Sequence, residues 1–244
     1  MLTSHAGALM PHIPEPPDLT VILLMHFVTD VPLEDPFIDS SLYVRPLLGN
    51  GGAQLSSDVT LDGATVGKFN STIDYVTAPS SADFDFGAGD FTIETFIYTN
   101  VGSTGVGMVF GNVNFAGAPS QGFYLNISGA TPNFYFYGND SFRTFAGTIA
   151  MTKGEWHHLA IVRSDGTVRI YIDGGAAGGG LDEGSSIIPS VAPIKVGGDP
   201  EAVFTNWTGY LDELRITRGV ARYSGIAVGP GTCFTVPSVP LPNP

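Results

Sequence analysis

Short runs of β-branched and aromatic residues, separated by glycine, asparagine and aspartate, recur along most of the chain, and no helical periodicity accompanies them. In residues 91–98 the alternate positions Phe91, Ile93 and Ile97 share one face of an extended strand. Phe96 and Tyr98 share the other face. Because both faces are apolar, this stretch is predicted to be a central strand.

The clearest predicted hairpin joins residues 156–163 to residues 168–172. Between them, Asp165-Gly166 supplies the residue types that adopt the positive φ angles of a tight turn. The alternation of the second strand places its aliphatic side chains on one face. The core residues expected from this hairpin are Trp156, Leu159, Ile161, Ile170 and Ile172.

Further strand signals predict the rest of the architecture. Residues 123–127 and 133–137 have the composition of a second antiparallel pair, and residues 210–216 that of a closing strand. About a dozen short strands without crossover helices favour two antiparallel sheets packed face to face. The predicted fold is therefore an all-β, two-sheet antiparallel jelly-roll sandwich.

The chain divides into three parts by composition. Residues 1–18 contain four prolines and form a predicted extended N-terminal arm, residues 19–236 form one domain, and residues 237–244 form a Pro-rich C-terminal tail. We expect both ends to contact other subunits instead of folding back on their own sandwich.

Charge and apolar runs exclude several partners. The formal net charge of −13, from 10 Lys and Arg against 23 Asp and Glu, repels phosphate backbones and anionic lipid, so nucleic-acid binding is not expected. The longest apolar run, residues 19–28, is too short for membrane insertion, and no basic residue precedes it as in a secretory signal. The single Cys233 cannot form an internal disulfide.

Five segments of the chain form a recognisable series. They are Asp39-Ser40-Ser41, residues 84–87 with 90–94, Trp156-His157-His158-Leu159-Ala160, Tyr171-Ile172-Asp173-Gly174, and residues 209–219 with Ala221-Arg222-Tyr223. Taken in order, these segments resemble the laminin-G-like, concanavalin-A-like jelly-roll domains, particularly those of tailed-phage structural proteins. The resemblance covers residues 19–236 and implies the same sandwich fold, which hosts lectins, glycosidases and adhesion modules.

Catalysis is not expected. Glycosidases of this fold carry a Glu-x-Asp-x-x-Glu strand, whose carboxylates flank the glycosidic bond, and the sequence has no such strand. Asp212 and Glu213 are adjacent and are predicted to point to opposite faces.

Calcium is the one cofactor that the resemblance suggests. If the first and last strands are neighbours, as the resemblance implies, Asp30, Asp39 and Asp212 supply oxygen ligands to such a site. Val28 stands where relatives place an acidic residue, and Leu42 where glycine commonly follows Asp-Ser-Ser. We therefore predict that any ion is weakly bound or absent, and that Asp39 and Asp212 bond backbone amides.

Aromatic residues in predicted loops are the candidate contact residues for a glycan or a protein partner: Phe115, Phe142, Phe204 and Trp207. The leading hypothesis is a non-catalytic, phage-type virion surface protein. It is a capsid decoration or head-fibre subunit or a small tail component, which forms a homo-oligomer and packs against other virion proteins. The alternative is an extracellular lectin module, of a tail fibre or a cell surface, that recognises host glycans.

Overall fold

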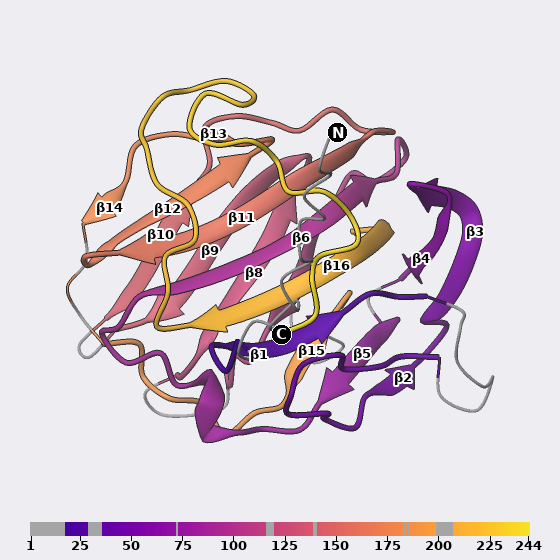
Figure 1. The fold of residues 1–244 in the computed structure, drawn as a ribbon, viewed down its shortest axis with the longest axis horizontal. Coiled ribbons are helices and arrows are strands. Elements are labelled where there is room, and N and C mark those ends of the chain that lie inside the picture. The colour runs from indigo at the N-terminus through magenta and orange to yellow at the C-terminus, as the bar shows by residue number, and fades with distance from the viewer. Residues whose placement is uncertain are drawn as a thin grey trace, which may run out of the picture.

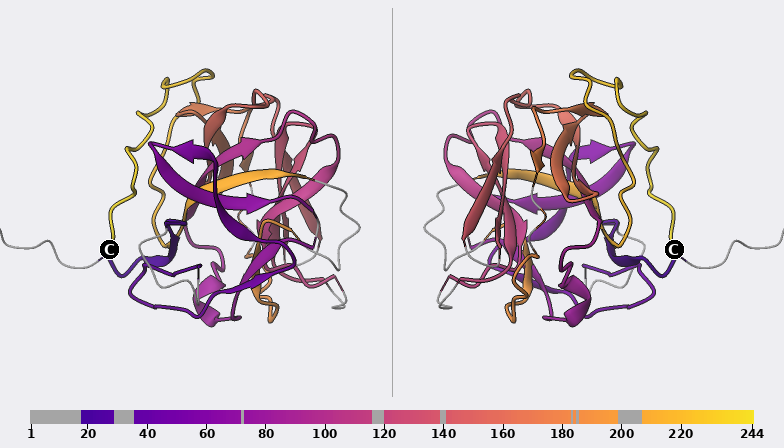
Figure 2. Two further views of the ribbon diagram at one scale, coloured as in Figure 1. Left: turned by 90° about the vertical axis from the view of Figure 1, so that its right-hand side faces the viewer. Right: turned by 90° about the vertical axis from the view of Figure 1, so that its left-hand side faces the viewer.

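The computed structural model describes residues 18–28, 36–71, 73–115, 120–138, 141–182, 184, 186–198 and 207–244. In this part of the chain, sixteen strands form two antiparallel sheets, and the short 3-10 helix η1 (Ala82–Phe84) is the one helical element. The sheets lie face to face (Figures 1 and 2), so the predicted all-β jelly-roll sandwich is confirmed.

The nine-stranded sheet has the order β13-β12-β11-β6-β16-β4-β3, with β1 also paired to β16 and β14 to β12. Its strands are β1 (Val21–Met25), β3 (Gln54–Leu61), β4 (Ala64–Phe69), β6 (Phe91–Thr99), β11 (Trp156–Ser164), β12 (Thr167–Ile172), β13 (Gly175–Ala176), β14 (Leu181–Asp182) and β16 (Gly209–Arg218).

The seven-stranded sheet has the order β10-β9-β8-β7-β15-β5-β2. Its strands are β2 (Leu48–Asn50), β5 (Tyr75–Ala78), β7 (Val106–Gly111), β8 (Phe123–Ser128), β9 (Thr131–Tyr137), β10 (Phe142–Ala146) and β15 (Ile194–Val196). The predicted pair of residues 123–127 and 133–137 is confirmed as β8 and β9.

The predicted hairpin is β11–β12, and its turn residues Asp165 and Gly166 have φ angles of 48° and 80°. Both are positive, as a two-residue hairpin turn of the primed type requires. The aliphatic residues expected in the core are all buried between the sheets: Leu159, Ile161, Ile170 and Ile172.

Trp156 corrects the core prediction. It lies three residues before Leu159 and therefore on the opposite, outer face of the strand, where it pairs with Tyr98 of β6. Its indole Nε1 donates to the Thr60 carbonyl oxygen at 2.9 Å, and its ring is only half-buried. The ring therefore packs on the outer face of the sheet and does not fill the core.

A β-bulge in β16 corrects a second expectation. The register against β6 shifts between Asp212 and Arg215, and Glu213 has a φ of 54°. A bulge inserts an extra residue and breaks the alternation of faces. Asp212 and Glu213 are both buried. Asp212 pairs with Phe96, which places its side chain on the outer face of the sheet. The Glu213 carboxylate also lies on the outer face, where it accepts from the Leu241 amide. The prediction of opposite faces is therefore wrong.

Residues 219–244, here called the C-terminal strap, cross the outer face of the nine-stranded sheet (Figure 1). The views from the side show that the strap stays on this one side of the sandwich (Figure 2). Tyr223 and Phe234 pack over a small apolar cluster of β11, β12 and β13. Leu241 is buried against Val21 and Leu24 of β1.

The strap overturns the expectation for residues 237–244. These residues pack on the sheet of their own chain, because Leu241 covers the outward apolar side chains of β1. The Leu241 amide also donates to Glu213 Oε2 at 2.6 Å. Residues 1–17 of the predicted N-terminal arm lie outside the described residues.

Candidate binding surfaces

The outer face of the seven-stranded sheet carries five aromatic rings from β8, β9, β10 and the segment after β7. We call Phe115, Tyr124, Tyr135, Tyr137 and Phe142 the aromatic row. Tyr124 and Tyr135 stack with centroids 4.6 Å apart and planes 7° apart. Phe142 stacks on Tyr135 at 5.5 Å, and Phe115 meets Tyr124 edge-on at 5.7 Å. Cross-strand pairing thus joins the separate segments into one surface.

The two phenylalanines of this row are the ones predicted as contact residues. The exposed fraction is 41% for Phe115 and 45% for Phe142, whereas Tyr124 is buried between its neighbours. Burial, with Tyr135 and Tyr137 close by, raises the pKa of Tyr124, so its hydroxyl stays protonated at neutral pH. Sequence reasoning missed the tyrosines as part of this surface, although their alternation along residues 123–137 was a usable signal.

The remaining predicted aromatics do not join this row. Trp207 is buried in the main core, and its Nε1 lies 3.3 Å from Thr99 Oγ1. Gly107 permits this packing, since a Cβ at that position would lie 2.0 Å from Trp207 Cβ. The Trp207 ring is therefore unavailable to a ligand, which corrects its assignment as a contact residue. Phe204 lies outside the described residues.

Asp39 holds three backbone amides. Its Oδ1 accepts from Leu24 N at 3.1 Å and from Ser41 N at 2.9 Å, and its Oδ2 accepts from Arg45 N at 2.9 Å. The side chain is buried where β1 meets the following loop. These bonds match the amide-binding role predicted for Asp39, and they fix the course of residues 39–45.

Asp212 has a different environment. Burial, reinforced by the neighbouring Glu213 charge, raises the pKa of Asp212 to about 8. Its Oδ1 accepts from the Glu213 amide at 2.9 Å, as predicted. Because a calcium ligand must be deprotonated, calcium binding at Asp212 would compete with this proton. Asp30 lies outside the described residues, and in the described ranges no three His, Cys, Asp or Glu side chains are grouped to hold a metal ion.

A buried polar cluster lies beneath the strap, on the outer face of the nine-stranded sheet. Glu94 Oε1 accepts from Arg215 Nε at 2.9 Å, while Glu94 Oε2 bonds His158 Nε2 at 3.1 Å and Tyr223 Oη at 2.5 Å. Burial opposes ionisation, but these bonds hold the pKa of Glu94 below its ordinary value. Because His158 Nε2 faces a carboxylate, it is the protonated nitrogen.

Comparison with known proteins identifies the family. Residues 70–223 match the family Laminin_G_3, described as the concanavalin A-like lectin/glucanases superfamily. This match spans more than half of the chain, so the protein belongs to that superfamily, as the motifs suggested. No curated protein matches the sequence.

Solved structures with the same fold include two toxin binding domains. The binding domain of Paraclostridial Mosquitocidal Protein 1 has a TM-score of 0.63 and 16% identity, over 82% of this chain and 49% of that one. The botulinum neurotoxin serotype G binding domain gives 0.62 and 16%, over 82% and 48%. A structure on the entry of botulinum neurotoxin type C gives 0.61 and 15%, over 82% and 48%. The chain thus spans about half the length of these proteins, and the likeness concerns the fold.

Membrane insertion was not expected from the sequence. Among the residues that the structure describes, no helix is long and apolar enough to cross a membrane.

Proposed function

We propose that this protein is a non-catalytic carbohydrate-binding module whose contact surface is the aromatic row. The observation that carries the proposal is the exposure of Phe115 and Phe142, which the sheet brings from separate segments into one row. Aromatic rings bind the apolar C–H faces of pyranose sugars. The inner rings stack on one another, so Phe115 and Phe142 offer the ring surface for a sugar.

The fold supports the same class of function. The superfamily comprises lectins and glucanases, and the similar structures are binding domains. For botulinum neurotoxin type C, the protein of another similar structure, cell entry is described as dependent on interaction with two ganglioside molecules. Since this chain matches about half of that protein, the comparison supports glycan binding as a class and leaves the choice of sugar to the site itself.

The buried carboxylates of β6 and β16 are not available for hydrolysis. A glycosidase needs two carboxyl groups that face an open cleft. Glu94, Asp212 and Glu213 are each at most 2% exposed, and all three accept hydrogen bonds from the protein. None of them is placed to reach a substrate.

A glycan array probed with the full chain, followed by titration of the sugars it binds, tests the proposal. Phe115→Ala and Phe142→Ala should each weaken binding by about tenfold, which corresponds to about 1.4 kcal/mol. Val101→Ala is the matched control, because Val101 is 73% exposed and does not belong to the aromatic row. The proposal fails if the wild-type chain binds no glycan, or if the double phenylalanine variant binds as well as the control.

The second candidate function is a virion surface subunit that uses the same row against a protein partner. Exposed aromatic residues are also typical of protein interfaces, and the resemblance of residues 209–223 to tailed-phage proteins favours this setting. A mass measurement of the purified chain separates the two candidates. A homo-oligomer without glycan binding supports the virion subunit, and a monomer with glycan binding supports an extracellular lectin module.

A further inference from the structure

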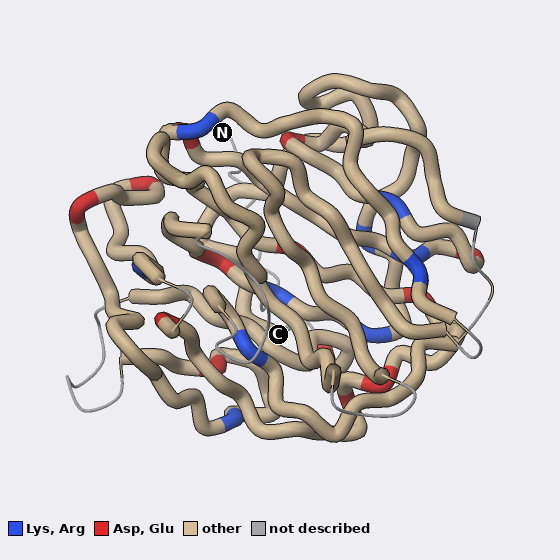
Figure 3. The backbone as a smooth tube through the Cα atoms, turned by 180° about the vertical axis from the view of Figure 1, so that it is seen from behind, with Lys and Arg blue, Asp and Glu red and all other residues tan. Residues whose placement is uncertain are grey.

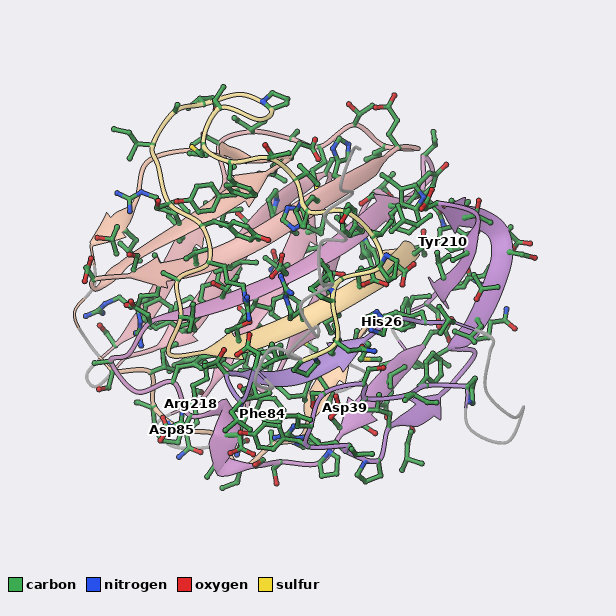
Figure 4. The ribbon with its side chains drawn as sticks, viewed as in Figure 1. His26, Asp39, Phe84, Asp85, Tyr210 and Arg218 are labelled. Atoms are coloured by element: carbon green, nitrogen blue, oxygen red, sulfur yellow. The ribbon has the colours of Figure 1, made fainter. Side chains whose placement is uncertain are left out.

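A groove lies along the rim of the sandwich, where the loop between β5 and β6 meets two other loops. It consists of two adjoining hollows of about 310 and 290 Å³ that share Ser80 and Ser81. We call it the rim groove. Its polar and aromatic lining comes mainly from Tyr43, Arg45, Ser80, Asp83, Asp85 and Ser190. Figure 4 shows Asp39, Phe84 and Asp85 along this lower edge, and Figure 3 shows acidic positions gathered there.

Arg45 makes one wall of the groove rigid. Its side chain is only 8% exposed, and its guanidinium lies 4.3 Å from the centroid of the Tyr43 ring and 4.9 Å from that of Phe84. Its Nη2 donates to Asp83 Oδ2 at 2.6 Å. The Arg45 backbone amide also donates a hydrogen bond to Asp39 Oδ2 at 2.9 Å, which fixes the Arg45 backbone. Tyr43 and Asp83 are therefore held in place before any ligand arrives, which lowers the entropic cost of binding.

The groove retains unused hydrogen-bonding capacity. Asp83 uses Oδ2 for Arg45 and for Ser81 Oγ, and Asp85 uses Oδ1 for the Gly87 amide. Asp83 Oδ1 and Asp85 Oδ2 have no partner among the described residues. Asp83 lines one hollow and Asp85 the other, and a carboxylate oxygen can accept from a ligand hydroxyl.

We propose that the rim groove binds a neutral saccharide. Sugar hydroxyls donate to Asp83 Oδ1 and Asp85 Oδ2, and they form hydrogen bonds with the Ser80 hydroxyl. The ring of Tyr43, a residue that is 41% exposed, packs on a C–H face of the sugar. This inference rests on the proposed carbohydrate-binding function. It adds a second contact region and the charge class of the sugar.

The charges select against acidic sugars. Arg45 is the cation of the groove, and it is neutralised by Asp83 at 2.6 Å, with Asp39 Oδ2 at 3.6 Å. Asp83 and Asp85 are left facing the hollows, on a chain of net charge −13. The three carboxylates of Asp39, Asp83 and Asp85 outnumber the single Arg45 guanidinium, so the net charge at the groove is negative and repels a sialylated or sulfated sugar.

The groove and the aromatic row adjoin the same segment but use different side chains. The Ile188 amide donates to the Tyr137 carbonyl oxygen at 2.8 Å, and Ser190 lines the groove two residues later. The groove lining and the aromatic row share no residue, so substitutions in the two surfaces can be tested separately.

The test is an array of neutral and sialylated oligosaccharides, followed by calorimetric titration of the neutral oligosaccharides that bind. Tyr43→Ala and Asp85→Ala lie on separate loops, and each should weaken binding of the neutral sugar by about tenfold, while Val101→Ala should not. Asp85→Asn should narrow the preference for neutral over sialylated sugars, since it removes one repelling charge. Melting temperatures of all variants confirm that they are folded.

The outcomes separate this inference from the proposed function. If Phe142→Ala weakens binding but both rim variants bind like Val101→Ala, the rim site is overturned and the carbohydrate-binding function stands. If the rim variants weaken binding, the rim site is supported whether or not the aromatic row contributes. Equal binding of sialylated and neutral sugars overturns the assigned charge class, and the absence of any glycan binding overturns both proposals.

Discussion

Arg215 approaches a single carboxylate oxygen of Glu94 with two nitrogens, Nε at 2.9 Å and Nη2 at 2.8 Å from Oε1. Glu94 is fully buried and Arg215 nearly so, and Tyr223 of the C-terminal strap bonds Glu94. A charge pair in such a place tolerates the loss of both partners better than the loss of one, since a lone buried charge remains without compensation.

Glu94→Ala should therefore lower the free energy of unfolding by about 3–5 kcal/mol, measured by urea denaturation. The change removes the acceptor of Arg215, His158 and Tyr223 together. The double variant Glu94→Met with Arg215→Met should recover part of this loss. A loss below about 1 kcal/mol for Glu94→Ala would show that water reaches the cluster.

Stability should fall as the pH rises from 5 to 9. Burial alone would lower the pKa of His26, but its bonds to Glu213 and Asn243 raise it overall. A histidine with a raised folded pKa contributes stability that is complete below its unfolded pKa and is lost as the pH rises through the folded value. The pKa of Asp212, raised to about 8 mainly by burial, acts in the same direction, because the folded state increasingly disfavours the charged form above about pH 4.

Asp212→Asn isolates the second contribution. The amide oxygen still accepts from the Glu213 amide but carries no charge. At pH 5 to 9 the variant should become progressively more stable than the wild-type chain, by about 1.4 kcal/mol for each pKa unit that separates the folded and unfolded carboxyl. Parallel melting curves against pH for the two chains would contradict the buried, protonated state of Asp212.

Ile170→Ala should cost about 2–5 kcal/mol of unfolding free energy, because it leaves a cavity in a fully buried part of the core. Chemical denaturation measures the change. Ile226→Ala is the matched control, since Ile226 is 76% exposed in the strap and should change stability by less than about 0.5 kcal/mol.

Leu241→Ala should release the end of the strap. The side chain is 2% exposed and covers Val21 and Leu24, so its loss should cost about 2 kcal/mol or more. Hydrogen exchange should rise most at the Leu241 amide, which bonds Glu213. Leu48→Ala, at an exposed position of the other sheet, is the control, and equal protection of the strap in both variants would contradict this prediction.

Chelation should have little effect on the melting temperature. Three amides already occupy the Asp39 carboxylate, so we expect a shift below about 5 °C between EDTA and millimolar calcium, by the linkage of binding to stability. Asp39→Ala should destabilise the chain equally in both buffers. A larger calcium-dependent shift that Asp39→Ala or Asp212→Ala abolishes would establish the site that the family resemblance implied.

The sequence by itself determined the strands and their inward faces. Alternation along residues 168–172, with an Asp-Gly turn between β11 and β12, predicted which side chains of β12 fill the core, because side chains in a strand alternate between two faces. The apolar residues on both faces of residues 91–98 predicted a central strand. The same local logic predicted that Asp39 bonds nearby amides. The exposure of Phe115 and Phe142 agrees with their selection as aromatic residues in predicted loops.

The tertiary structure decided what depends on distant segments. The bulge at Glu213 broke the alternation, so both acidic residues of β16 became buried on one side. Trp207 was assigned to a surface but fills the core, because Gly107 leaves room for it on another strand. The rim groove joins Tyr43, Asp85 and Ser190 from three loops. No local sequence pattern predicts a contact between loops so far apart in the chain, because the positions of the loops depend on how the two sheets pack against each other.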